Sequence, residues 1–289
     1  LPRGAEWRTL DATDPAAVRA ATRDCDGVVN CLAGDADTIV GSARAIYSAA
    51  AAGSPRPRVV HLSSMAVYGT ASGTLDERAP LRADLGPYSA AKVAAEAGAM
   101  QAADSIILRP GIVYGPGSAW WTDRIARLLL ARRLGDLGAA GNGCCNLVHV
   151  DDLAAAIIAA LRLPAAGTRI YNIAAPGAPS WNDYFARFAA ALGLGPVRRI
   201  GPIRLAFELR AVGPALKLVE LASLLAQRAQ SDARPPIRPW LVALCRQALR
   251  LDTQAANRDL APHWTDLDAG LEACARWFHQ TRSAQQRHR

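Results

Sequence analysis

The sequence predicts an α/β fold, in which a doubly wound parallel sheet is followed by a smaller, mostly helical lobe. Short apolar stretches of strand length alternate with helical stretches, the order that parallel strands and their crossovers require. Residues 58–63 form a nearly continuous apolar run, typical of a strand buried on both faces. Beyond Pro176, helical patterns punctuated by proline dominate. We therefore place the sheet domain at 1–175 and the helical lobe at 176–289, and expect residues 115–146 to contribute to the lobe.

The elements follow one another with recognisable start and stop signals. Asp14 precedes Pro15, and an aspartate N-cap followed by proline at the first helical position typically begins a helix. Gly53 ends the next helix, and Pro87 begins the one that follows the third strand. Strands are expected at residues 5–10, 27–30, 58–63, 105–109 and 170–173. Helices are expected at residues 15–23, 37–52, 88–102, 151–161, 181–192, 203–228, 239–249 and 267–281.

Composition excludes several functional classes. The chain has 289 residues, of which 51% are hydrophobic and 20% charged, which is ample for a buried core. Its net charge of +8 comes mainly from arginine. No basic stretch is interleaved with aromatic residues, so we expect no nucleic-acid partner. The six cysteines form no Cys-x-x-Cys pair and no metal-ligand spacing, which predicts reduced thiols, no metal and a cytoplasmic protein.

The chain contains no apolar run of the length that a membrane-spanning helix needs. Its richest apolar segment, residues 211–226, is interrupted by Pro214, Lys217 and Glu220. Such a segment cannot comfortably cross a bilayer, but it could lie on one. Peripheral contact with a membrane therefore stays open.

A tyrosine and a lysine stand four residues apart in the predicted helix 88–102. Tyr88 and Lys92 would lie on one helix face, one turn apart. An ammonium beside a phenol favours the phenolate, and a phenol with a lowered pKa can act as a general acid or base. Only Lys92 and Lys217 are lysines among 33 Lys and Arg residues, which argues against a chance pairing. The pair is a candidate proton-handling group; the alternative is a solvated lysine.

Further candidate segments follow two predicted strands. Ser64 stands at the carboxyl end of the strand 58–63, where open α/β sheets bind ligands, although it could merely cap a turn. The prolines and glycines of 108–117, Leu-Arg-Pro-Gly-Ile-Val-Tyr-Gly-Pro-Gly, allow the backbone to approach a ligand. The segment 148–152, Val-His-Val-Asp-Asp, opens a helix. Its aspartates are expected to be caps, and its histidine to be a packed side chain.

Together, these segments resemble the extended short-chain dehydrogenase/reductase family, which contains nucleotide-sugar epimerases and dehydratases and 3β-hydroxysteroid dehydrogenases. The resemblance runs from about residue 5 to residue 278 and implies a Rossmann-like doubly wound sheet. The segments that carry it are Leu10-Asp-Ala-Thr-Asp14, Ser63-Ser-Met-Ala-Val-Tyr-Gly69, Tyr88-Ser-Ala-Ala-Lys92, Leu108-Arg-Pro-Gly-Ile-Val-Tyr-Gly-Pro-Gly117 and Val148-His-Val-Asp-Asp152.

The resemblance also implies an activity and roles for residues. Tyr88 would be the proton donor or acceptor at the substrate oxygen, Lys92 would lower its pKa and hold the nicotinamide ribose, and Ser64 would polarise the same oxygen. The cofactor would be NAD or NADP, which carries the hydride. The implied cofactor contacts are Asp11 at the adenine, Leu32, Ala33 and Gly34 on the adenosine side, Pro110, Gly111 and Val113 beside the nicotinamide, and Tyr88 and Lys92.

The sequence departs from the family in two places. Family members begin with a strand, a Gly-x-x-Gly-x-x-Gly turn, a helix and a second strand, and nothing before Ala5 matches them. We therefore expect an N-terminally truncated sheet without its first two strands; the glycines of 138–143 come too late to replace the turn. In the sugar-nucleotide branch an arginine commonly precedes the His-Val-Asp-Asp motif, but here the segment 144–149 reads Cys-Cys-Asn-Leu-Val-His.

The missing cation favours a small hydrophobic, sterol-like or lipid-like substrate over a diphosphate. The favoured function is an NAD(P)-dependent oxidoreductase acting on a hydroxyl or carbonyl. A nucleotide-sugar epimerase or dehydratase and a non-catalytic truncated family member remain alternatives. The resemblance also leaves a homodimer open.

Overall fold

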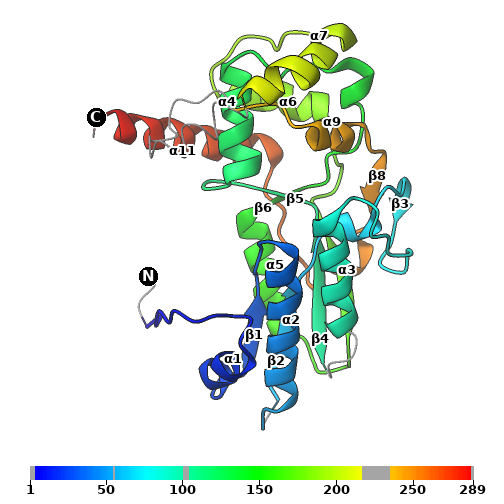
Figure 1. Ribbon diagram of the computed structural model, residues 1–289, viewed down its shortest axis with the longest axis vertical. Helices are drawn as coiled ribbons and strands as arrows, with labels where there is room; N and C mark the ends of the chain where they lie inside the picture. Colours follow the sequence, from blue (N-terminus) through cyan, green and yellow to red (C-terminus); the bar gives the residue numbers. More distant parts are fainter. Residues whose placement is uncertain (1–3, 55, 100–103, 217–234, 288–289) are drawn as a thin grey trace. The chain divides into compact units, whose positions relative to one another are not determined.

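The computed structural model describes residues 4–54, 56–99, 104–216 and 235–287 (Figure 1). Its helices are α1 (Pro15–Thr22), α2 (Ala36–Ala51), α3 (Pro87–Ala99), α4 (Arg124–Leu130), α5 (Val150–Arg162), α6 (Trp181–Ala191), α7 (Pro202–Phe207), α9 (Pro239–Arg246), α10 (Gln254–Asp259) and α11 (Leu267–Arg287). Its strands are β1 (Gly27–Asn30), β2 (Arg58–Leu62), β3 (Gly73–Leu75), β4 (Ser105–Pro110), β5 (Ile112–Tyr114), β6 (Leu147–His149), β7 (Arg169–Ile173) and β8 (Leu249–Leu251).

The chain divides into two compact units. The first comprises residues 1–111, 153–173 and 251–263, and the second comprises 112–152, 174–250 and 264–289. The first unit contains the parallel sheet, and the second is mostly helical. Residues 251–263 belong to the first unit again. The predicted single boundary after residue 175 does not include this return. Sequence periodicity did not reveal this return because it reports local structure, not which distant segments pack together.

The sheet of the first unit has four parallel strands in the order β1-β2-β4-β7. Its register pairs Val29 with Val60, and Val60 with Ile106. Parallel strands carry their carboxyl ends to one edge, so the loops after β1, β2 and β4 meet there. This confirms the predicted α/β architecture with a parallel sheet.

Helices cover both faces of this sheet. On one face, residues of α1, α2 and α3 form a buried cluster with Val59, Ile107 and Ile170. Tyr171 points to the opposite face because successive strand residues alternate, and its hydroxyl bonds to Asp259 of α10. β1 lies at one edge of the sheet, where Val29 remains 37% exposed.

The expected strand at residues 5–10 is absent, which corrects the prediction. This segment has no regular secondary structure, and its residues are exposed, Trp7 to 76%. The exposed side chains of Glu6 and Arg8 form hydrogen bonds with each other. A strand requires a partner for its backbone groups, and among the described residues this segment pairs with none.

The second unit is built around aromatic residues of α6. Trp181, Tyr184, Phe185 and Phe188 are all fully buried. Ser180 and an aspartate three residues later form a capping box that begins this helix. β5 and β6 form a short parallel pair in the same unit.

The predicted helix 203–228 is seen in part. α7 continues into a π-helical turn at Glu208–Val212, and residues 217–234 lie outside the described chain, together with most of the apolar segment 211–226. Among the described helices, none is both long and apolar enough to cross a membrane.

The sheet register predicts different costs for two valine truncations. Val60 is 0% exposed and Val29 is 37% exposed. We expect Val60→Ala to lower the free energy of unfolding by about 2–3 kcal/mol, because it removes buried methyl groups and leaves a cavity. Val29→Ala, the matched control at the sheet edge, should cost about 1 kcal/mol or less. Urea denaturation of the two variants measures both values; equal losses would contradict the edge position of β1.

Candidate catalytic and cofactor site

Ser64 lies at the carboxyl edge of the sheet, immediately after β2. Its backbone is extended, and its hydroxyl accepts a hydrogen bond from the amide of Ala66 at 3.2 Å, which caps the 3₁₀ turn Met65–Tyr68. The amide of Ser63 donates to the carbonyl of Leu108 in β4 at 2.8 Å. The end of β2 is thereby joined to the strand that leads into the Pro-Gly segment. The capping interpretation of Ser64 is therefore true, and it leaves the serine at the ligand-binding edge.

Tyr88 and Lys92 lie on the first two turns of α3, as the spacing predicted. Lys92 is 4% exposed, and its Nζ donates to the carbonyl of Leu62 at 2.8 Å and to that of Leu32 at 3.5 Å. The ammonium lies 5.9 Å from the centre of the Tyr88 ring. The helix thus places its cation between the ends of β1 and β2, with the tyrosine beside it.

The Ser64 side chain influences the pKa of the Tyr88 phenol. Burial raises the pKa of Tyr88 above its ordinary value, and a hydrogen bond with the Ser64 side chain acts in the opposite direction. Residue Tyr88 is nevertheless 45% exposed, so a ligand can reach its ring. The structure therefore brings Ser64, Tyr88 and Lys92 together, as the resemblance implied.

The expected electrostatic effect of Lys92 on Tyr88 is not present in this structure. Burial lowers the pKa of Lys92, against the raising influence of Cys31 and Glu96. For Tyr88, desolvation outweighs the bond with Ser64, so its pKa is raised and not lowered. The lysine stands near the ring but directs two of its N–H groups to main-chain carbonyls. The direction of the Tyr88 pKa is therefore opposite to the predicted one.

The candidate adenosine-side residues lie in the first unit, in two separate loops. Leu32, Ala33 and Gly34 connect β1 to α2, and the amide of Leu32 donates to the Asn30 side chain at 3.1 Å. Asp11 is exposed, and Thr13 donates to its carboxylate from the amide and from the hydroxyl, which lowers the pKa of Asp11. No described bond joins the two loops.

The candidate nicotinamide-side residues are divided between the two units. Pro110 ends β4, and the amide of Gly111 donates to the carbonyl of Ile173 at 2.9 Å in the first unit. Val113 lies in β5 of the second unit, where its carbonyl accepts from Ser118.

Sequence reasoning missed a buried histidine beside the lysine. His61 is 1% exposed, and its Nδ1 lies 3.2 Å from the side-chain nitrogen of Asn30. Burial, aided by the charge of Lys92, lowers the pKa of His61 to about 3, so the ring is neutral. His61 lies within the apolar run 58–63, so the sequence pattern predicts only that it is buried in a strand. Its contact with Asn30 cannot be predicted from neighbouring residues.

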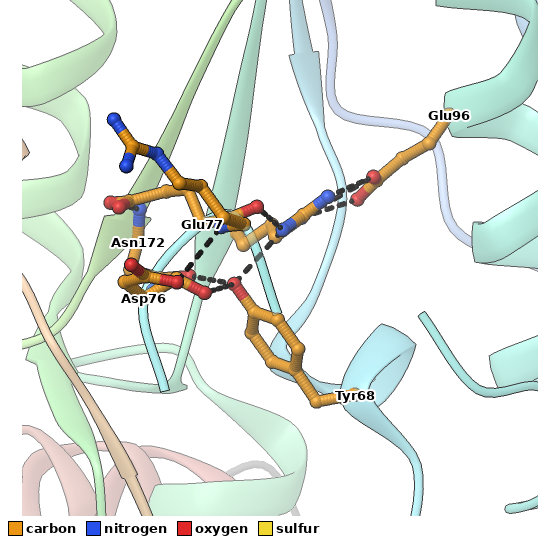
Figure 2. Close-up of polar contacts among 7 residues, drawn as sticks. Tyr68, Asp76, Glu77, Glu96 and Asn172 are labelled. Atoms are coloured by element: carbon orange, nitrogen blue, oxygen red, sulfur yellow. Dashed lines mark hydrogen bonds and ion pairs between the residues drawn. The ribbon is translucent and has the colours of Figure 1, made fainter. Parts of the chain in front are cut away.

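A second missed feature is a buried polar network centred on Arg109 (Figure 2). Its guanidinium binds the carboxylate of Glu96 through two nitrogens, at 3.0 and 2.7 Å, and donates to the hydroxyl of Tyr68 at 2.9 Å. Tyr68 in turn lies 2.6 Å from the side-chain oxygen of Asn172. The sequence carried one signal: Glu96 stands four residues after Lys92, on the same face of an alanine-rich helix.

The glycine-rich segment 138–143 lies in the second unit and does not form a phosphate-binding turn. Residues 138–141 form a 3₁₀ turn, and the next regular element is β6, whose first residue is Leu147. A side chain at Gly141 would collide with Asn182, and one at Gly135 would collide with the carbonyl of Arg198. These glycines permit close packing, and no α-helix N-terminus follows them to hold a pyrophosphate.

The His-Val-Asp-Asp segment has a structural role in the second unit. His149 is buried and packs edge to face against Tyr114, with 5.3 Å between ring centres. Asp152 accepts from both the amide and the hydroxyl of Thr265. It therefore ties two distant segments together and does not cap its own helix, which corrects the expected role.

The described residues fit the nicotinamide-ribose half of a dinucleotide. The ammonium of Lys92 has a third N–H beyond its two carbonyl bonds, and the Tyr88 ring is partly open. The buried hydroxyl of Ser63 and the Nε2 of His61 have no hydrogen-bond partner. Polar groups left unpaired at such an edge are consistent with a polar ligand. No such group marks a pyrophosphate site in the described part of the chain.

Burial of Lys92 predicts an observable titration. Only Lys92 and Lys217 are lysines, so a protein labelled with ¹³Cε-lysine gives two resonances, and Lys92→Arg identifies one of them. We expect the pKa of Lys92 to lie below 10.5 in the folded protein because its ammonium is desolvated. The unfolded chain then binds this proton more tightly, so stability rises with pH between the lowered value and 10.5. A midpoint at or above 10.5 would contradict the buried position.

Comparison with known proteins gives one family match. The family model described as "NAD dependent epimerase/dehydratase family" matches residues 2–174. Protein YeeZ of Escherichia coli strain K12 is 32% identical over 146 residues, or 48% of each chain. A 3-diazoavenalumate denitrifying reductase of Streptomyces sp. is 32% identical over 168 residues, 55% of this chain and 54% of that protein. The chain thus matches about half the length of these curated relatives.

Solved structures share the fold at low sequence identity. MoeE5 in complex with UDP-glucose and NAD aligns with a TM-score of 0.66 at 22% identity, covering 97% of this chain and 88% of the other. The dTDP-glucose 4,6-dehydratase of Bacillus anthracis strain Ames, in complex with NAD, aligns with a TM-score of 0.68 at 18% identity, covering 95% and 80%.

Proposed function

The chain belongs to the NAD dependent epimerase/dehydratase family, and from this premise we propose that it is an NAD(P)-dependent oxidoreductase acting on a hydroxyl or carbonyl group. The observation that carries the proposal is the convergence of Ser64, Tyr88 and Lys92. The Ser64 side chain acts on the pKa of Tyr88 as a hydrogen-bond partner, and the lysine ammonium lies 5.9 Å from the centre of the tyrosine ring. These are the groups that a proton transfer at an alcohol or ketone oxygen requires.

In the proposed reaction, each residue has a separate task. Bound NAD or NADP would supply or accept the hydride. Ser64 and Tyr88 would hold the substrate oxygen by hydrogen bonds, with Tyr88 giving or taking its proton. Lys92 would hold the nicotinamide ribose through its remaining N–H. Asp11 and the loop 32–34 would contact the adenosine, and Pro110, Gly111 and Val113 would flank the nicotinamide.

The electrostatics of Tyr88 predict different pH dependences for carbonyl reduction and alcohol oxidation. Because burial raises the pKa of Tyr88, its phenol is protonated at neutral pH and can donate a proton to a carbonyl oxygen. Alcohol oxidation requires the deprotonated form, so its rate should rise as the pH approaches that raised value. Reduction should instead be insensitive to pH in the neutral range and fall only at higher pH.

We further propose that the substrate is hydrophobic and sterol-like or lipid-like. Cys145 is 0% exposed in the segment where the family's sugar-nucleotide branch commonly has an arginine, and burial raises the pKa of its thiol well above the ordinary value. A neutral, buried side chain cannot pair with a diphosphate. Homodimerisation and contact with a membrane also remain proposals. The exposed Ile203 and Phe207 of α7, at 87% and 62%, support an apolar contact.

A nucleotide-sugar epimerase or dehydratase is the second candidate. The observation that favours it is the shared fold with MoeE5 in complex with UDP-glucose and NAD. The same three residues would serve a transient oxidation of a sugar hydroxyl. A non-catalytic family member, which binds no cofactor and serves as a binding or scaffold protein, is the third alternative.

Replacement of the tyrosine hydroxyl tests the proposed catalysis. The protein, expressed from its complete reading frame, is screened with alcohols and ketones while NAD(P)H absorbance is followed. With the best substrate, Tyr88→Phe should lower kcat by about 100-fold or more, because the general acid is lost. The matched control is Tyr47→Phe, which removes a buried hydroxyl that has no hydrogen-bond partner, and it should keep parental activity. A Tyr88→Phe enzyme as active as its parent would overturn the proposed function.

Calorimetry separates the two catalytic candidates. Because the segment 144–149 lacks a cation, we expect no detectable heat when UDP-glucose or dTDP-glucose is added at millimolar concentration. The same protein should bind the apolar alcohol or ketone found in the screen. Micromolar binding of either sugar nucleotide would instead favour the epimerase or dehydratase.

A further inference from the structure

We propose that Arg109 is a positioning residue, which holds the Ser64 turn and the Tyr88/Lys92 helix in register with each other. The inference rests on the proposed function, because it concerns the same three residues. Arg109 touches none of them directly. It acts through Glu96 on one side and Tyr68 on the other.

The contact with α3 is a buried, two-point ion pair. Arg109 Nε lies 3.0 Å from Glu96 Oε1, and Nη2 lies 2.7 Å from Oε2; both side chains are 2% exposed. Glu96 is one helical turn beyond Lys92 and two turns beyond Tyr88. A two-point contact fixes orientation as well as distance, so it sets where this face of the helix lies over β4.

The contact with the Ser64 turn passes through the Tyr68 hydroxyl. Arg109 Nη1 donates to this hydroxyl at 2.9 Å, and the guanidinium carbon lies 5.1 Å from the ring centre of Tyr68. Tyr68 is the last residue of the 3₁₀ turn that Ser64 caps, and it is 0% exposed. The position of Ser64 is therefore coupled to Arg109, the β4 residue that also holds α3.

The remaining contacts hold the Arg109 side chain itself in place. Arg109 Nη1 also donates to the carbonyl of Glu77 at 3.0 Å, and a carboxylate oxygen of Glu77 accepts the amide of Asn172 at 2.8 Å. The side-chain nitrogen of Asn172 donates to the carbonyls of Leu75 and Asp252. Burial alone would lower the pKa of Arg109, but its contacts with Glu96 and Tyr68 raise it overall, so the guanidinium stays charged. A buried guanidinium with this many partners is favourable only when all of its hydrogen bonds are formed.

Two variants separate positioning from stability. Tyr68→Phe removes one oxygen, and with it the hydrogen bond that joins Arg109 to the Ser64 turn, while both charges remain. The double variant Glu96→Leu/Arg109→Met replaces the ion pair by apolar side chains, an exchange that folded proteins often tolerate. The matched control is Arg58→Met/Asp104→Asn, which removes another ion pair, of 2.7 Å, at the opposite end of the same strands.

The readout is the titration of Tyr88 in a ¹³Cζ-tyrosine-labelled protein, followed by NMR without cofactor or substrate. Tyr88→Phe identifies its resonance among those of the six tyrosines. A loosened Ser64 turn weakens the hydrogen bond that lowers the pKa of Tyr88. We therefore expect the midpoint to move to higher pH in Tyr68→Phe and in the Glu96/Arg109 double variant, and to stay unchanged in the Arg58/Asp104 control.

Each outcome decides the inference. An unchanged Tyr88 midpoint in Tyr68→Phe would overturn it, whether or not the double variant folds. Equal shifts in the control would also overturn it, because they would indicate general loosening of the unit. The result is independent of catalysis: if Tyr88→Phe kept full activity, the proposed function would fail while the NMR result still reported on positioning.

Discussion

The Lys92 ammonium donates hydrogen bonds to the carbonyls of both Leu62 and Leu32. It can reach both because the strands of the sheet are parallel. Leu62 is the last residue of β2, and Leu32 follows the neighbouring strand β1, which ends at the same edge. An antiparallel partner would carry its end to the opposite edge, and one side chain could not reach both. The same geometry brings Ser63 to the carbonyl of Leu108 and so sets Ser64 beside the end of β4. The candidate site is thus a consequence of strand direction.

Burial has opposite effects on the two titratable members of this site. It lowers the pKa of Lys92 and raises the pKa of Tyr88, and in both cases it favours the neutral form. The tyrosine is thereby kept as an acid, while Cys31 and Glu96 oppose the effect of burial on the pKa of the lysine. A buried ammonium of this kind costs stability, as functional groups often do. The neutral His61 next to it avoids adding a second positive charge.

The two units differ in how closely they follow the family's pattern. In the first, the Ser, Tyr and Lys positions are occupied and in contact. In the second, the His-Val-Asp-Asp segment is used for packing and for tying α5 to the segment before α11, through Asp152 and Thr265. Cys145, which precedes the His-Val-Asp-Asp segment, is enclosed in the apolar interior.

Local sequence signals predicted most of the first unit. Asp14 and Pro15 began α1, the apolar run beginning at Arg58 formed β2, and the Tyr88–Lys92 spacing placed both side chains on one helix face. These features depend on residues within one or two helical turns of each other, so a single stretch of sequence contains them. The segment 5–10 failed as a strand because strand formation depends on a partner, which its own apolar residues do not reveal.

By itself, therefore, the sequence determined the α/β class, the order of elements and the identity of the candidate proton-handling residues. Only the tertiary structure decided that Arg109 joins Glu96 to Tyr68, that His61 lies buried beside Asn30, and that residues 251–263 return to the sheet unit. It also decided the direction of the Tyr88 pKa, because desolvation is a property of the surrounding fold. The physical reason is the same in each case: burial and pairing between residues far apart in the chain have no local signature.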